Sequence, residues 1–227
     1  FDFDDRGRIW VGENYSHPVW KKDGVTDRIL ILEDTDNDGR FDKRKVFWNK
    51  GRYLTGMAVG HGGVWIGNTP ELSFIPDRDG DDVPDSEPIV MLDGFRVSTN
   101  NVLNNFHWGP DGWLYMSMGN TWVEKNAPLP FRQLQGIESD DKTKYPLTKV
   151  YTRETYKKSY HSLEKRETEG GILRCRPGGH DLEIYARGMR NPWDICMDSG
   201  FNWLGTDNDP GGPAERIFMP VPSKRTR

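Results

Sequence analysis

The segment FHWGPDGWLYMSMGN (residues 106–120) contains a short apolar stretch, a turn around Gly112, and a second stretch rich in aromatic residues. This pattern predicts a β-hairpin, because short apolar runs flank a Pro-Asp-Gly turn. Three other segments repeat the pattern, with Gly7, Gly63 and Gly200 in their turns: FDFDDRGRIWVGEN (1–14), MAVGHGGVWIGNT (57–69) and ICMDSGFNWLGTDN (195–208). A unit that recurs along the chain indicates a repeat architecture.

A second pair of predicted strands follows each of the first three hairpins. These pairs are 28–32 with 45–47, 72–75 with 89–92, and 171–175 with 182–185. The Asp-rich turns within the first two pairs begin at Asp34 and Asp77, 43 residues apart. A four-stranded antiparallel unit that repeats every ~40–50 residues is typical of a β-propeller blade. A β-sandwich with similar turn spacing is the alternative, and the recurrence of the hairpin text itself favours the propeller.

The sequence therefore predicts an all-β fold, a partial β-propeller that occupies the whole chain (1–227) as one domain. The expected blades are about 1–52, 53–96, 97–188 and a partial blade at 189–227. Since about three and a half blades of an expected six-bladed ring leave open sheet edges, we expect a fragment of a longer protein or pairing with another copy. Residues 121–169 form a charged insertion, either a lid over a pocket or a solvated excursion.

The composition excludes several classes of protein. The net charge is −4, so the chain has no basic footprint for nucleic acid. No run approaches the ~18 apolar residues of a transmembrane helix, and no signal peptide is visible. The two cysteines, Cys175 and Cys196, form no CxxC motif. Two separate buried thiols are favoured over a disulfide, which stays open.

Both Asp-rich turns have carboxylates at positions 1, 3, 5 and 9, as calcium loops do. Ca²⁺ binds six to eight hard oxygen ligands, which alternating Asp residues in a tight turn can supply. Position 6 is Gly39 in the first turn and Asp82 in the second, and neither turn has an acidic residue at position 12, so these are not EF-hands. A metal-free Asp/Gly turn is the alternative. The expected ligands are Asp34, Asp36, Asp38 and Asp42 in the first turn, and Asp77, Asp79, Asp81 and Asp85 in the second.

The calcium turns join third and fourth strands, so in a propeller they lie on the face opposite the loops that join blades. Those opposite loops are dense in Asn, Asp, Arg and Trp, notably at 190–193 and 206–212. Amides and carboxylates suit hydroxyl groups, Arg suits an anion and Trp suits a ring. The loops are therefore expected to bind a polyol, sugar or quinone, unless the Asn and Asp residues only terminate strands.

The chain resembles a known family through a series of motifs. In order, these are DRILILEDTDNDGRFDKRKVF, TGMAVGHGGVWIG, FIPDRDGDDVPD, LNNFHWGPDGWLY, GMRNPWDI and TDND. They resemble the membrane-bound dehydrogenase propeller of Planctomycetes and Verrucomicrobia, which is often fused to a haem-binding CxxCH domain. The layout is more distantly similar to soluble sugar dehydrogenases that use pyrroloquinoline quinone (PQQ). The resemblance implies an extracytoplasmic protein that oxidises a sugar or alcohol with PQQ and Ca²⁺ and passes electrons to a c-type haem domain outside this chain.

The resemblance also implies roles for individual residues. Arg190 and Asn191 match quinone-contacting positions, and Trp193 stands where the dehydrogenases have Gln. Asn101 occupies the position of the catalytic His in the sugar dehydrogenases, beside the cofactor.

An amide cannot act as a general base. A base would therefore come from elsewhere, with Asp207 and Glu13 as candidates, while His107 is expected to be a packed histidine. The alternative function is a non-catalytic, calcium-stabilised propeller that binds glycans or partner proteins.

Overall fold

The computed structural model describes residues 1–17, 24–69, 71–93, 103–119, 170–208, 216–220 and 222. Within these ranges the chain forms β-strands and turns, and no helix occurs. In particular, these residues contain no helix that is long and apolar enough to cross a membrane. Asn101 and the insertion 121–169 lie outside the described residues.

The strands form four antiparallel sheets, in each of which the strands pair in chain order. The first sheet contains β1 (Asp2–Phe3), β2 (Ile9–Glu13), β3 (Asp27–Glu33) and β4 (Lys43–Gly51). The second contains β5 (Leu54–Val59), β6 (Gly63–Asn68), β7 (Glu71–Pro76) and β8 (Ile89–Asp93). The third contains β9 (Leu103–Trp108), β10 (Leu114–Met118), β11 (Gly170–Cys175) and β12 (Glu183–Met189). The fourth contains β13 (Pro192–Met197), β14 (Trp203–Asp207) and β15 (Arg216–Phe218).

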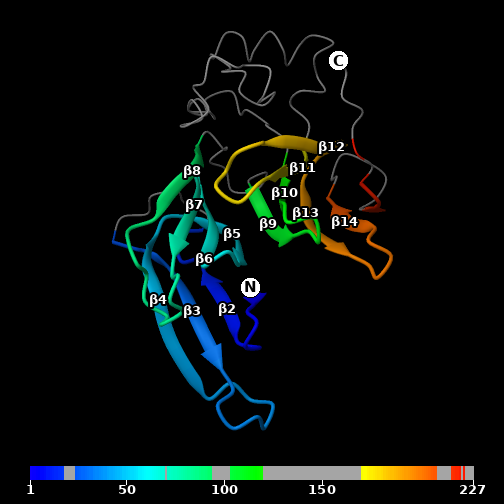
Figure 1. The fold of residues 1–227 in the computed structure, drawn as a ribbon. Helices are drawn as coiled ribbons and strands as arrows, with labels where there is room; N and C mark the ends of the chain where they lie inside the picture. Colours follow the sequence, from blue (N-terminus) through cyan, green and yellow to red (C-terminus); the bar gives the residue numbers. More distant parts are fainter. Residues whose placement is uncertain are drawn as a thin grey trace.

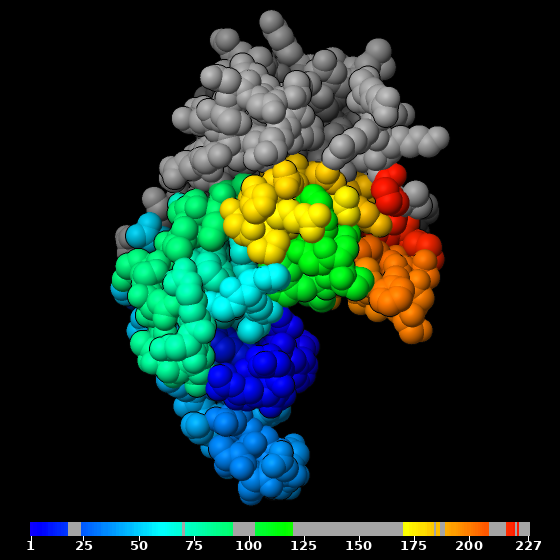
Figure 2. All heavy atoms as spheres, in the orientation of Figure 1, coloured from blue at the N-terminus to red at the C-terminus, as the bar shows by residue number. Residues whose placement is uncertain are grey.

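The sheets are arranged as the successive blades of a propeller, which confirms the predicted all-β, partial propeller fold. The first strands of neighbouring sheets contact one another: β1 packs on β5, β5 on β9, and β9 on β13. These are the inner strands. Figure 2 shows the blades as an arc, from the blue first blade to the orange fourth blade. In each of the first three blades the turns between strands one and two and between strands three and four lie at one end, the turn face. The loops that join blades lie at the opposite end, the loop face (Figure 1).

The hairpin turns use the left-handed backbone conformation that glycine adopts without a steric penalty. Gly7 (φ 77°) and Gly112 (φ 74°) have the expected positive φ in the first and third hairpins. In the second hairpin Gly62 (φ 76°) has this conformation, whereas Gly63 already begins β6. A Cβ atom at Gly63 would lie 2.2 Å from the carbonyl oxygen of Ile75. A glycine is therefore needed at position 63 because β6 and β7 approach closely there, and not because of the turn.

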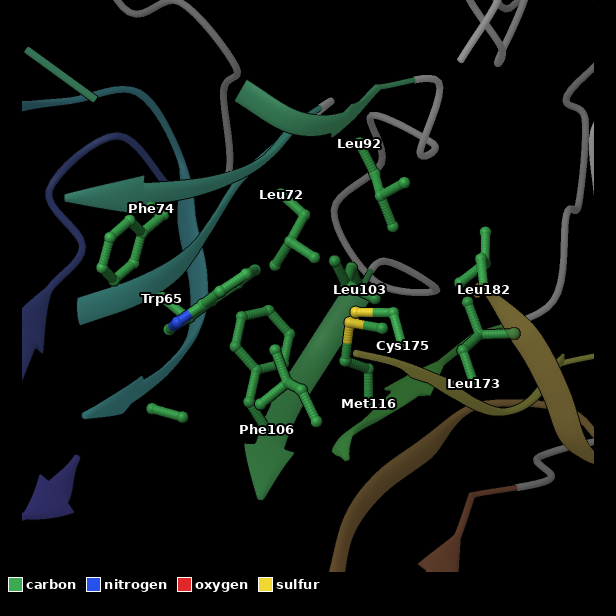
Figure 3. Packing of buried hydrophobic residues seen from close by; sticks show 12 residues of the cluster. Trp65, Leu72, Phe74, Leu92, Leu103, Phe106, Met116, Leu173, Cys175 and Leu182 are labelled. Carbon is green, nitrogen blue, oxygen red and sulfur yellow. The ribbon is translucent and has the colours of Figure 1, made fainter. Parts of the chain in front are cut away.

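The core consists of three apolar clusters, each at a junction between two blades. Trp10 and Ile31 of the first blade pack with Ile66 of the second, and Ile172 of the third blade packs with Trp203 of the fourth. Figure 3 shows the cluster between the second and third blades; its labelled residues are Trp65, Leu72, Phe74, Leu92, Leu103, Phe106, Met116, Leu173, Cys175 and Leu182. Central strands are covered on both faces, which explains their short continuous apolar runs.

Both cysteines are free thiols on different strands. Cys175 lies in the cluster of Figure 3, and burial raises its pKa to about 12. Cys196 of β13 is exposed, so the expectation of two buried thiols holds for only one of them.

Candidate functional site

The carboxylate of Asp207, at the end of β14, holds the loop that joins the third and fourth blades. Its Oδ1 atom accepts hydrogen bonds from the backbone N–H groups of Arg190 (3.1 Å) and Asn191 (2.8 Å). Asp207 is only 2% exposed. Because a buried carboxylate must be hydrogen-bonded, these contacts attach the loop to β14. The structure thus brings together three residues that the sequence predicts at the site, while a general-base role for Asp207 stays a prediction.

The side chain of Asn104, on inner strand β9, attaches the same loop to the third blade. Its Nδ2 atom donates to the carbonyl oxygen of Pro192 (2.7 Å) and lies 3.4 Å from Oδ1 of Asn191. The buried hydroxyl of Ser117 also donates to the carbonyl oxygen of Trp193 (3.2 Å). Neither of these two polar residues is among the site residues predicted from the sequence. A polar residue in the middle of a strand predicted to be buried is the signal that could have found them.

Two side chains of this loop are available for a ligand. Nη1 of Arg190 donates to both the carbonyl oxygen and Oδ1 of Asn208, each at 3.1 Å, which positions the guanidinium group. The indole of Trp193 is 52% exposed. A positioned guanidinium can pair with a carboxylate, and an exposed indole can stack on a planar ring. A guanidinium and an aromatic face are the groups that an anionic ligand with a planar ring would contact.

Glu13 ends β2 in the first blade and is paired there with basic residues. Its carboxylate lies 2.6 Å from Arg28 and 3.6 Å from Arg44, and it accepts a hydrogen bond from the Tyr15 hydroxyl (3.1 Å). Within the described ranges, no hydrogen bond or ion pair connects Glu13 to the loop of Arg190. The structure therefore does not bring the two candidate bases into one cluster.

His107 lies at the inner edge of the junction between the third and fourth blades. Its Nε2 atom is 2.7 Å from Oδ1 of Asp194, and the two side chains are 34% and 51% exposed. The expectation of a packed histidine holds in part: the ring lies 6.4 Å from that of Trp203, but it is also partly exposed and paired with a carboxylate. Burial would raise the pKa of Asp194, but the hydrogen bond and charge of His107, with a hydrogen bond from Asn105, lower it.

A small cavity of about 90 Å³ lies between the first two blades. It is lined by Phe1, Gly12, Ile29, Leu54, Thr55, Gly56, Met57, Ile66 and Asn105. Pockets that enclose drug-sized ligands have volumes of roughly 300–1,000 Å³. This cavity is therefore too small for a quinone cofactor.

The first Asp-rich turn joins β3 and β4 and projects from the arc of blades (Figures 1 and 2). Carboxylate oxygens of Asp34, Asp36 and Asp38 lie within 4.8 Å of one another. Asp42 is not a member of this cluster; it accepts hydrogen bonds from the backbone N–H (2.9 Å) and the hydroxyl (2.6 Å) of Thr35. Three of the four predicted ligands therefore converge, and Asp42 instead closes the turn.

The second Asp-rich turn joins β7 and β8. Here carboxylate oxygens of Asp77, Asp79 and Asp85 lie within 4.8 Å of one another. Asp81 is not a member of this cluster, and its Oδ1 accepts a hydrogen bond from the backbone N–H of Val83 (2.8 Å). Again three of the four predicted ligands converge.

Asp77 is the buried member of this second cluster, only 8% exposed. Its Oδ1 atom is buried and has no hydrogen-bond partner among the described residues. Burial raises the pKa of Asp77, and the nearby charges of Asp79, Asp81 and Asp82 raise it further, against a hydrogen bond from the Asp82 backbone. A buried carboxylate oxygen without a donor is costly unless a cation neutralises it.

The two turns share one backbone conformation. Position 4 is left-handed in both, at Asn37 (φ 59°) and Gly80 (φ 69°). Position 6 is also left-handed in both, at Gly39 (φ 88°) and Asp82 (φ 65°). Asp82 adopts a conformation that is unfavourable for most residues other than glycine, although Asp tolerates it better than larger residues do.

These features define a class of protein: a propeller with clusters of carboxylates in the turns of one face and a loop that contains Arg and Asn on the other face. Residues 1–140 match the family described as a domain of unknown function, DUF7133. Because this match covers more than half of the chain, the protein belongs to the DUF7133 family. A comparison with curated proteins finds no match.

Two solved structures are similar to this chain. One, from Thermus thermophilus, has the same fold and is described as a ‘putative oxidoreductase (glucose dehydrogenase)’; the identity is 16%, the TM-score is 0.56, and the match covers 97% of this chain. The other is the PQQ-bound form of an aldose sugar dehydrogenase from Streptomyces coelicolor, with 14% identity, a TM-score of 0.43 and 86% of this chain covered. The chain spans 60% and 54% of the lengths of these two proteins.

Proposed function

We propose that this chain is the propeller module of an extracytoplasmic, dehydrogenase-like protein that oxidises a sugar or an alcohol with PQQ and Ca²⁺. Electrons would pass to a c-type haem domain outside this chain. The observation that carries the proposal is the loop between the third and fourth blades, where Asp207 holds the backbone of Arg190 and Asn191. PQQ, when bound, accepts the electrons removed from the substrate.

In this proposal, the residues of the chain bind and orient the cofactor. The guanidinium of Arg190, positioned by Asn208, would pair with a carboxylate of the quinone. Asn101 would contribute an amide, and the exposed indole of Trp193 would cover a ring face. Asn191, predicted from the sequence to contact the quinone, is only 3% exposed and would support the loop instead. Asp207 and Glu13 remain the candidates for the general base.

Binding and activity measurements with matched arginine variants test this proposal. Titration of the protein with PQQ in the presence of Ca²⁺ should shift the absorbance of the quinone and quench the tryptophan fluorescence of the protein. The loaded protein should then reduce an electron-accepting dye when some sugars or alcohols are added. Arg190→Ala should weaken PQQ binding about tenfold or more, since charge-assisted hydrogen bonds contribute roughly 1.5–3 kcal/mol. Arg176→Ala is the control, because Arg176 follows β11 on the turn face and stacks on Trp113. No spectral change and no dye reduction would refute the proposal.

We propose further that both Asp-rich turns bind Ca²⁺. Three carboxylates converge in each turn, and hard oxygen ligands suit this ion. Both turns lie on the turn face, away from the loop of Arg190, so the ions would stabilise the fold and take no part in catalysis.

A non-catalytic propeller that binds glycans or partner proteins is the second candidate function. The presence of Asn101 where a catalytic His is expected favours it, and so does the 52% exposure of Trp193, since aromatic rings stack on sugars. Saturable glycan binding without PQQ, reduced by Trp193→Ala, would support this candidate.

A further inference from the structure

The second Asp-rich turn has two sides with different contacts. Asp77, Asp79 and Asp85 form the carboxylate cluster, whereas the three residues 80–82 between them face the first blade. The buried Oδ1 of Asp77, which has no hydrogen-bond partner among the described residues, is an acceptor that a cation in this cluster would satisfy. The contacts of residues 80–82 indicate what that cation would control.

Basic side chains of the first blade contact each of these three residues. Arg6 donates to the carbonyl oxygen of Gly80 (2.9 Å), and Lys45 donates to the carbonyl oxygen of Asp81 (3.0 Å). Arg8 forms an ion pair with Oδ2 of Asp82 at 2.9 Å, with the Arg8 side chain 7% exposed and that of Asp82 16% exposed. The turn of the second blade therefore docks on the first blade through side chains and backbone together.

Arg8 also pairs with a second carboxylate, that of Asp4. Its Nε atom lies 2.8 Å from Oδ2 of Asp4, which also accepts a hydrogen bond from the indole N–H of Trp10 (2.9 Å). Buried ion pairs of this kind are strongly disrupted when one partner is displaced, because the other charge is left without compensation. The position of Asp82 thus matters to the hairpin of β1 and β2 as well as to its own turn.

The first Asp-rich turn provides the contrast. Its sixth residue is Gly39, which has no side chain to reach another blade, while its backbone conformation is the same. From this comparison we propose that Ca²⁺ in the turn 77–85 joins the first blade to the second through the Asp82–Arg8 ion pair, a link called the clasp below. In contrast, Ca²⁺ in the turn 34–42 stabilises only its own turn. This inference rests on the proposed calcium binding, and it is independent of PQQ and of any dehydrogenase activity.

Hydrogen exchange of the segment 1–13 in the whole chain, with and without Ca²⁺, measures the clasp directly. A ligand that binds only the closed state suppresses opening by a factor of 1 + [Ca²⁺]/Kd. At a free Ca²⁺ concentration about 100-fold above Kd, exchange in this segment should therefore slow by up to about 100-fold. Calorimetric titration with Ca²⁺ alone gives the number of sites in each variant.

Three variants separate calcium binding from its effect on the protection of residues 1–13. Asp79→Asn should lose one calcium site and the protection of 1–13. Asp36→Asn, the matched change in the first turn, should lose one site and keep that protection. Asp82→Gly copies the first turn at position 6, so it should keep both sites and lose the protection. The clasp is refuted if Asp82→Gly keeps full protection, if bound Ca²⁺ leaves 1–13 unprotected in the unmodified chain, or if Asp79→Asn loses no site.

Discussion

Nε2 of His107 and Oδ1 of Asp194 lie 2.7 Å apart and join the inner strands of the third and fourth blades. Although burial opposes it, the hydrogen bond and charge of His107 lower the pKa of Asp194 below its ordinary value of 3.8. A carboxylate with a lowered pKa in the folded state stabilises that state above the unfolded-state pKa, and this contribution is lost as the pH falls through the folded-state pKa.

Asp194→Asn should therefore flatten the acid side of the stability curve. The melting temperature of the unmodified chain should fall as the pH drops from about 4 toward 2.5, and part of that fall should be absent from the variant. Thermal melts of both proteins across this range measure the difference. Parallel curves would show that the pair contributes nothing to acid sensitivity.

Asp207→Ala should destabilise the fold because it removes the acceptor for two backbone N–H groups beneath a buried loop. At about 1–3 kcal/mol for each of these two unsatisfied groups, the expected loss in the free energy of unfolding is about 2–6 kcal/mol. Asn68→Ala is the control: Asn68 accepts one N–H, from Arg52, at the equivalent but exposed position of the second blade. Its expected cost is below about 1 kcal/mol. Denaturant titration decides, and equal costs would contradict the structural role of Asp207.

Gly56→Ala should disrupt the junction of the second and third blades. A Cβ atom there would lie 1.7 Å from the backbone oxygen of Asn104, too close for any rotamer change to relieve. Overpacking of this kind costs about 1–3 kcal/mol or more. Gly12→Ala is the matched control, since a Cβ atom at Gly12 would meet only the sulfur of Met57, at 3.6 Å. If the two variants have the same melting temperature, β5 and β9 do not approach as closely as described.

Removal of calcium with EGTA should lower the melting temperature of the chain by several degrees. At free Ca²⁺ about 100-fold above Kd, one bound ion stabilises the folded state by about 2.7 kcal/mol. Asp36→Ala should remove part of the EGTA effect, because the first turn then loses one of its three converging carboxylates. A melt that is insensitive to EGTA would refute calcium binding in both turns.

Much of the fold could be predicted from the sequence because the information is local. Each hairpin contains its own turn residues and its own apolar runs, as the segment around Gly112 illustrates. The second hairpin shows the limit of such reasoning. Gly63 is needed because a side chain there would collide with Ile75, whereas Gly62 forms the turn. The sequence does not distinguish these two reasons for a glycine, so the pattern predicts the turn at Gly63, one residue too late.

The contacts between blades could not be predicted. Asp194 is 87 residues from His107, and Asp82 is 74 residues from Arg8. No periodicity or turn motif links such positions; only the stacking of one sheet on the next brings them together. Within a turn the sequence predicts which carboxylates are near, but not which three of them converge. Asp42 and its counterpart Asp85 both accept a hydrogen bond from the N–H of the second turn residue, yet only Asp85 joins its cluster.

The three apolar clusters each draw residues from two sheets. A cut between Gly51 and Leu54, at the border of two sheets, would therefore divide one cluster and expose both of its halves to water. A cut between β2 and β3 would separate only Trp10 from that cluster and leave its other members, Ile66 and Trp48 among them, on one fragment. Each junction between two blades is thus a shared core, and fragments intended to fold alone should be designed around whole junctions.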